Sequence, residues 1–102
     1  MREIIVSKLA LSEVKQIADY IGAKFSINDR IKFLEKFQKT IFMIQVNPEM
    51  FPKSEKYSTR YKSVLTKYTT IFYQFDSKRI KITSVYDTRQ NPKKINKTKY
   101  HR

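Results

Sequence analysis

The sequence has 102 residues, of which 40% are hydrophobic and 14% aromatic, so its length and apolar content predict one globular domain with a single core. It contains 22 lysines and arginines but only nine acidic residues, and the resulting net charge of +13 predicts a polyanion or an acidic protein as partner. The sequence has no cysteine, which excludes disulfides, thiol catalysis and cysteine-based zinc sites. It has no apolar run of signal-peptide or membrane-span length, so we expect a cytoplasmic protein that does not contact membranes.

The first 25 residues are expected to form a short strand and a helix. Residues 3–6 alternate through Ile4 and Val6, as a strand does. Further on, apolar residues recur at steps of three and four with polar residues between them, which predicts an amphipathic helix. Its expected core-facing positions are Leu11, Val14, Ile17, Ala18, Ile21 and Phe25.

A second helix is predicted to start at Ser26. Asp29 follows three residues later, in the spacing of a capping box, where the serine side chain accepts from the Asp29 amide. The helix must end by Asn47 because Pro48 disfavours helical geometry in the residue before it. Its expected apolar positions are Ile27, Ile31, Leu34, Phe37, Ile41 and Ile44. Two such helices joined by a few residues predict an antiparallel helical hairpin.

After an irregular loop at 47–60, the apolar period changes to two. Segments 61–65, 69–75 and 79–86 are rich in Tyr, Phe, Ile, Val and Thr, which predicts a three-stranded antiparallel meander that the first strand can extend. The expected fold is α+β, with the order β-α-α-β-β-β and an antiparallel sheet packed against an N-terminal helical hairpin. We therefore predict a domain over residues 1–90 and a basic C-terminal tail over 91–102.

Several kinds of site are excluded by residue type. One glycine cannot build the glycine-rich loops that hold nucleotide phosphates. The single histidine, His101, is penultimate in the predicted tail, where a general base or metal ligand would not be held in place. Carboxylates are sparse in the second half, and Asp76 is explained by a turn. No metal and no cofactor are therefore expected.

The positive charge is concentrated in the second half of the chain. Residues 1–52 hold eight basic and six acidic groups, a net of +2, whereas residues 53–102 hold fourteen and three, a net of +11. Cations that bind phosphates alternate there with aromatic rings that can stack on unpaired bases, a mixture that suits RNA or single-stranded nucleic acid. The residues expected to bind a target or partner are Lys53, Arg60, Tyr61, Lys62, Lys67, Tyr86 and Arg89.

A set of motifs is spread over about nine tenths of the chain. They comprise a pattern of residues on the two helices, the loop NPEMFP at 47–52, the strand TIFYQF at 70–75 and the segment VYDTRQNP at 85–92. The helix residues are Leu11, Glu13, Ile17, Asp19, Tyr20, Ile21, Phe33 and Phe37. No single motif is diagnostic, but together they form a specific set, which resembles the RelE/ParE superfamily of bacterial toxins.

The resemblance implies a toxin of a type II toxin–antitoxin system that inhibits growth. It implies a cognate antitoxin as partner, and contact with operator DNA only through the toxin–antitoxin complex. The target it implies is DNA gyrase for a ParE-like protein, or ribosome-bound mRNA for a RelE-like endoribonuclease. A more remote alternative is a basic nucleic-acid-binding module without an antitoxin.

The nuclease branch places several basic residues on the sheet, and this sequence retains only part of that set. Lys62 stands where such enzymes carry a strand lysine, and Arg89 lies near their late arginine, so these two are the candidate catalytic residues. Val64 and Thr70 replace residues expected to be basic. Tyr100 and His101 are similar to a terminal pair of one nuclease subgroup but come too late in the chain. These departures favour the ParE-like alternative.

Arg89 is the single residue most strongly expected to be functional. It is a lone arginine near the end of the last predicted strand, where its guanidinium can bind a phosphate or a carboxylate through two hydrogen bonds. Its replacement by alanine should abolish toxicity with little change in stability, because exposed substitutions usually cost little. The competing interpretation is a structural ion pair with Asp87.

Overall fold

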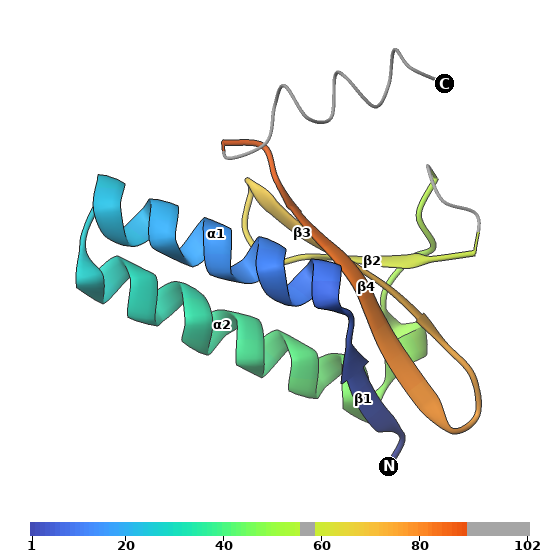
Figure 1. The fold of residues 1–102 in the computed structure, drawn as a ribbon. Helices are drawn as coiled ribbons and strands as arrows, with labels where there is room; N and C mark the ends of the chain where they lie inside the picture. Colours follow the sequence, from blue (N-terminus) through green and yellow to red (C-terminus); the bar gives the residue numbers. More distant parts are fainter. Residues whose placement is uncertain (56–58, 90–102) are drawn as a thin grey trace.

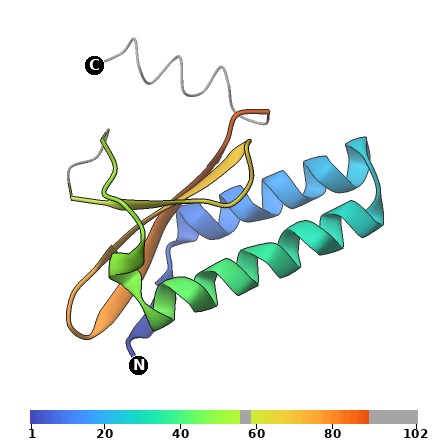
Figure 2. The same ribbon diagram turned by 180° about the vertical axis from the view of Figure 1, so that it is seen from behind.

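A computed structural model describes residues 1–55 and 59–89 and confirms the expected order of elements. The elements are β1 (Glu3–Val6), α1 (Lys8–Lys24), α2 (Ile27–Val46), a single 3-10 turn η1 (Pro48–Met50), β2 (Tyr61–Val64), β3 (Thr69–Phe75) and β4 (Arg79–Asp87) (Figure 1). The helical hairpin lies on one side of the sheet in both views (Figures 1 and 2). The predicted tail at 91–102, with Tyr100 and His101, lies outside the described residues.

The four strands form one sheet in the order β1-β4-β3-β2. The meander of β2, β3 and β4 is antiparallel, as expected. The first strand does extend this sheet, but it pairs with β4 in parallel, so the sheet is mixed and not wholly antiparallel. An alternating pattern indicates which side chains share a face but not the direction of the neighbouring strand. The parallel register places Ile4 beside Ile80 and Val6 beside Ile82.

Both helices begin at a serine whose side chain caps the helix. Ser26 accepts from the Asp29 amide at 3.0 Å, which confirms the predicted cap. Ser7 accepts from the Ala10 amide at 3.0 Å and donates to the Thr83 carbonyl at 2.9 Å, which fixes the start of α1 to β4. Within the described residues, neither helix combines the length and the apolarity needed to cross a lipid bilayer.

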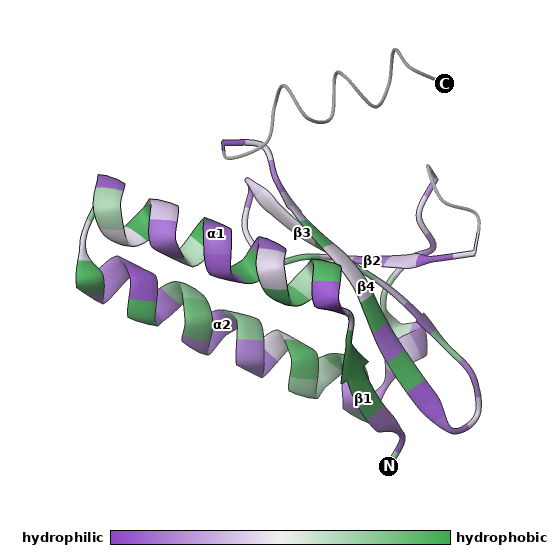
Figure 3. Ribbon diagram, viewed as in Figure 1, coloured by the Kyte–Doolittle hydropathy of each residue, from purple (hydrophilic) through white to green (hydrophobic). Residues whose placement is uncertain are grey.

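The core lies between the hairpin and one face of the sheet. Apolar and polar residues alternate along β4 (Figure 3), and Ile80, Ile82 and Val85 are completely buried. Tyr73 is also completely buried, its hydroxyl donates to the Pro48 carbonyl at 2.6 Å, and burial raises its pKa. The remaining buried hydrophobic residues are Ala10, Val14, Ile17, Ala18, Ile21, Phe33, Phe37, Ile44, Leu65 and Ile71.

Four residues predicted to face the core are exposed instead. Leu11, Phe25, Ile27 and Ile31 have exposed fractions of 57%, 55%, 72% and 45%. Helical spacing identifies the apolar stripe, but not how far along the helix the partner layer reaches. The tip of the hairpin extends beyond the sheet (Figures 1 and 2), so Phe25, Ile27 and Ile31 have no sheet to pack against.

Candidate functional site

The structure separates the two candidate catalytic residues onto opposite faces of the sheet. Tyr61 and Ser63 face the core, so strand alternation directs Lys62, which lies opposite Phe72, to the face without helices. Arg89 instead pairs with the completely buried Asp87 and reaches α1, where its guanidinium carbon lies 5.9 Å from the Tyr20 ring centroid. Lys62 and Arg89 are therefore not brought together.

The face of the sheet away from the helices, here called the open face, carries Lys62 on β2, opposite Phe72 of β3. The register places Val64 opposite Thr70, and Thr70 opposite Tyr86, on this same face. Val64 is 65% exposed, so the position where a nuclease would carry a second cation is an accessible apolar surface. Burial, and then the neighbouring Asp87 carboxylate, raise the pKa of Tyr86, which keeps its phenol neutral at physiological pH. Lys62 is the one cation in this group of residues.

Three further predicted residues lie at the edge of β2. Tyr61 packs on the core, with its ring centroid 5.6 Å from that of Tyr73 and 4.9 Å from that of Phe75. The Lys53 ammonium nitrogen lies 6.0 Å from the Tyr61 ring centroid, and the Lys53 side chain is exposed. The Arg60 carbonyl accepts from the Ser54 amide at 2.7 Å, which closes the loop beside this edge.

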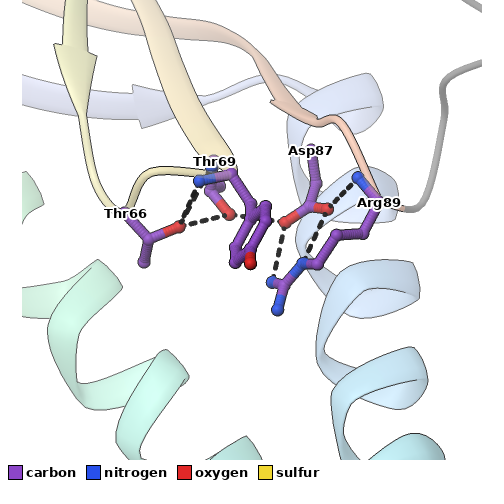
Figure 4. Close-up of polar contacts among 5 residues, drawn as sticks. Thr66, Thr69, Asp87 and Arg89 are labelled. Atoms are coloured by element: carbon purple, nitrogen blue, oxygen red, sulfur yellow. Dashed lines mark hydrogen bonds and ion pairs between the residues drawn. The ribbon is translucent and has the colours of Figure 1, made fainter.

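Arg89 is part of a buried polar network on the helix side of the sheet (Figure 4). Its Nη2 lies 3.0 Å from Oδ2 of Asp87, and its Nε and backbone amide donate to Oδ1 at 3.3 and 2.9 Å. The Thr69 hydroxyl donates to Oδ2 at 2.5 Å and accepts from the Thr66 hydroxyl at 3.2 Å. The ion pair between Arg89 and Asp87, the competing interpretation of Arg89 from the sequence, is therefore present.

The network holds a charge in the protein interior. Asp87 has no exposed surface, and burial alone would raise its pKa. The hydrogen bonds from Arg89 and Thr69, together with the positive charge of Arg89, outweigh burial and lower the pKa of Asp87. The carboxylate is therefore ionised at neutral pH. Two nitrogens of the Arg89 guanidinium, Nε and Nη2, are therefore already engaged in compensating this charge.

A cavity of about 520 Å³, here called the hairpin-tip cavity, opens beside this network. It lies between the tip of the helical hairpin and the turn that joins β2 to β3. The Arg89 guanidinium carbon is 4.2 Å from the Tyr68 ring centroid, so the ion pair and the ring form one wall together. Of the predicted binding residues, Lys67 and Arg89 line this cavity.

Sequence reasoning missed the α2 contribution to this cavity. Lys32 and Lys36 line it together with Phe33, yet their spacing resembles that of an ordinary solvated helix face. Phe25 also lines it, although it was predicted to be a core residue. The available signal was the pair of lysines four residues apart, a spacing at which like charges on a helix repel each other.

Comparison with known proteins gives a consistent result for the fold. The sequence matches the family described as "ParE toxin of type II toxin-antitoxin system, parDE" over residues 4–92. No curated protein sequence matches closely enough to count as a relative.

Solved structures of three toxins are similar to the described fold. A "Chromosomal ParDE TA system from P. aeruginosa" has a TM-score of 0.73 at 12% identity, over 85% of this chain and 96% of the other. The YoeB dimer from Staphylococcus aureus has a TM-score of 0.59 at 20% identity, over 83% and 94%. YafQ in the E. coli DinJ-YafQ complex has a TM-score of 0.56 at 11% identity, over 87% and 96%. At these identities the likeness shows the fold alone.

Proposed function

The chain belongs to the ParE toxin family of type II toxin–antitoxin systems, and from this we propose that it inhibits growth as a ParE-like toxin that acts on DNA gyrase. The cognate antitoxin is the partner that neutralises it, and operator DNA is contacted only through the toxin–antitoxin complex. The cytoplasm, where gyrase is found, is the compartment in which it acts.

The choice of target depends on one observation. A nuclease site on the open face would need several cations, and the described residues around Lys62 supply few. Cleavage of RNA develops negative charge on a pentavalent phosphate, which positioned cations must stabilise. On the open face, the described residues beside Lys62 include Val64 and Thr70, which are uncharged, where the nuclease branch would carry cations. Arg89, the second candidate, is paired with Asp87 on the other side of the sheet. These features support a non-nucleolytic toxin.

The alternative is a RelE-like endoribonuclease that cuts mRNA on the ribosome. The open face favours it in one respect, since Lys62, Phe72 and Tyr86 place a cation beside two rings on which bases can stack. An enzyme of this kind would depend on the ribosome to complete its acid–base groups, because no complete set is present among these residues.

Expression from a tightly repressed promoter tests the proposal in cells. Growth should stop after induction, and co-expression of the short acidic protein encoded beside the toxin should restore it. Plasmid DNA should lose negative supercoiling and accumulate linear molecules, while cellular messages stay intact. Normal growth with soluble protein present would refute the toxin function. Cut messages with normally supercoiled plasmid would refute gyrase as the target and favour the nuclease.

A further inference from the structure

The hairpin-tip cavity combines exposed rings with a rim of cations. Three rings line it: those of Phe25 and Tyr68, which are 55% and 36% exposed, and that of the buried Phe33. Aromatic surface of this kind is ordinarily covered in a folded domain, and in this chain it lines a cavity whose volume lies within the range of ligand sites. The open face, which carries Lys62, is on the other side of the sheet.

The charge on the rim is not balanced within the described part of the chain. Lys32 and Lys36 lie one turn apart on α2, and Lys67 lies across the cavity in the turn between β2 and β3. None of these three lysines forms an ion pair within residues 1–55 and 59–89. Asp29 is the one carboxylate among the described residues that line the cavity; it accepts from the Ser26 hydroxyl at 2.9 Å and keeps its charge, so three lysines face a single negative charge. The rim is thus complementary to carboxylates or phosphates.

The residues that line the cavity favour an apolar side chain over a nucleobase as its occupant. The rings of Phe25, Phe33 and Tyr68 offer stacking surface but few groups that could bond to a base edge. The Thr66 side-chain oxygen accepts from the amides of Tyr68 and Thr69 and donates to the Thr69 hydroxyl, so it is already engaged. An apolar side chain needs only the rings, whereas a base would also need its polar edge paired by the charged residues on the rim, which flanking anions would then have to share.

We propose that the hairpin-tip cavity is the anchor site for an acidic peptide segment of a partner protein. One large apolar side chain enters between Phe25, Phe33 and Tyr68, and carboxylates on either side of it pair with Lys32, Lys36 and Lys67. The Asp87–Arg89 pair holds the Tyr68 side of the cavity in place before binding. This inference rests on the proposed function, because an antitoxin is the expected source of such a segment.

Blocked peptides of the form Glu-Glu-X-Glu-Glu, with X as Trp, Leu or Ala, test the site on the purified full chain. The chain contains no tryptophan, so the fluorescence of the peptide with Trp at X reports binding without a protein background. The Trp peptide should bind and the Leu peptide should displace it, while the Ala peptide should be a much weaker competitor. A Phe25→Ala variant, altered at an exposed ring, should weaken binding of the Trp and Leu peptides while leaving the Ala peptide unchanged.

Two double variants with the same net charge distinguish binding by the rim lysines from attraction by the overall positive charge of the protein. Lys32→Gln with Lys36→Gln should weaken binding by roughly threefold to thirtyfold at low salt, the effect of losing two exposed ion pairs. Lys8→Gln with Lys78→Gln removes the same charge from exposed lysines outside the cavity and should change binding by no more than about twofold, since distant charges are screened. Melting curves of all variants establish that each is folded.

Three results would overturn the proposal. The Ala peptide could bind as tightly as the Trp peptide, or the two pairs of lysine substitutions could weaken binding equally. Either result would mean that the peptides are held only by nonspecific attraction to a basic protein. Adenosine 5′-monophosphate could displace the Trp peptide more effectively than the Leu peptide does, which would indicate a nucleotide site. Because no gyrase or ribosome is present in these mixtures, the outcome is independent of whether the chain proves to be a gyrase toxin.

Discussion

Replacing Arg89 by alanine should destabilise the protein strongly, contrary to what the sequence alone suggests for an exposed arginine. Asp87 is completely buried, and the Arg89 side chain is only 22% exposed where it pairs with that carboxylate at 3.0 Å. Removing one partner of a buried pair leaves an uncompensated charge, which costs about 3–5 kcal/mol in general. Because Arg89 lies at an opening through which water can enter, we expect a smaller loss than this, about 2–3 kcal/mol.

Thermal and urea unfolding of Arg89→Ala measures this loss. For a domain of this size, 2–3 kcal/mol corresponds to a fall in Tm of roughly 10–20 °C. Arg79→Ala is the matched control, since Arg79 pairs with Glu3 at 3.1 Å in a setting where both side chains are about two thirds exposed. That variant should lose less than about 1 kcal/mol. Adding Asp87→Asn to Arg89→Ala should recover stability relative to the single variant, because it removes the buried charge.

The pH dependence provides a second test of the same network. In the native protein the pKa of Asp87 is lowered, so the pair contributes stability above the unfolded value of about 3.9 and loses it as pH falls through the folded pKa. Without Arg89, burial dominates and the pKa of Asp87 rises. The variant then binds a proton on folding, so its deficit should shrink as pH falls from neutral to about 4. A native Tm for Arg89→Ala, or a deficit that does not change with pH, would refute this reasoning.

Three smaller changes test separate contacts, each by urea unfolding. Ser7→Ala removes the N-cap of α1 and the bond to the Thr83 carbonyl, and should cost about 1–2 kcal/mol; a neutral result would mean that the cap contributes nothing. Tyr73→Phe should cost about 1–2 kcal/mol because it leaves the buried Pro48 carbonyl without its donor, and an unchanged midpoint would argue against that hydrogen bond. Ser63→Ala should instead stabilise by up to about 1 kcal/mol, since the buried Ser63 hydroxyl has no partner in the described part of the chain; destabilisation would point to a partner or a bound water.

Local patterns in the sequence predict local structure well. The Ser26 cap depends on residues three positions apart, and the end of α2 before Pro48 depends on adjacent residues, so both were predicted correctly. The direction of β1 depends on a strand more than seventy residues away, and no local pattern encodes it. The exposure of Ile27 and Ile31 likewise depends on where the sheet ends relative to the hairpin, which only the assembled layers determine.

The sequence predicts which residues are candidates for the site but not how the fold groups them, for a related reason. Motif positions placed Lys62 and Arg89 in one set, but strand alternation sends Lys62 to the open face while the ion pair with Asp87 turns Arg89 toward the helices. The concentration of charge in the second half of the chain also directed attention away from Lys32 and Lys36, which α2 brings to the hairpin-tip cavity. The cavity combines lysines of the first half of the chain with residues of the second, so counting the charges of each half separately does not reveal it.

The claim that this is a ParE-like toxin is tested most directly with purified components. The protein is added to relaxed plasmid with DNA gyrase and ATP, and in parallel to ribosomes programmed with a defined mRNA. We predict that supercoiling stops, that linear plasmid accumulates, and that the mRNA remains whole. Cleavage of the mRNA on the ribosome, with gyrase supercoiling at its normal rate, would contradict the account and identify the open face around Lys62 as a nuclease site.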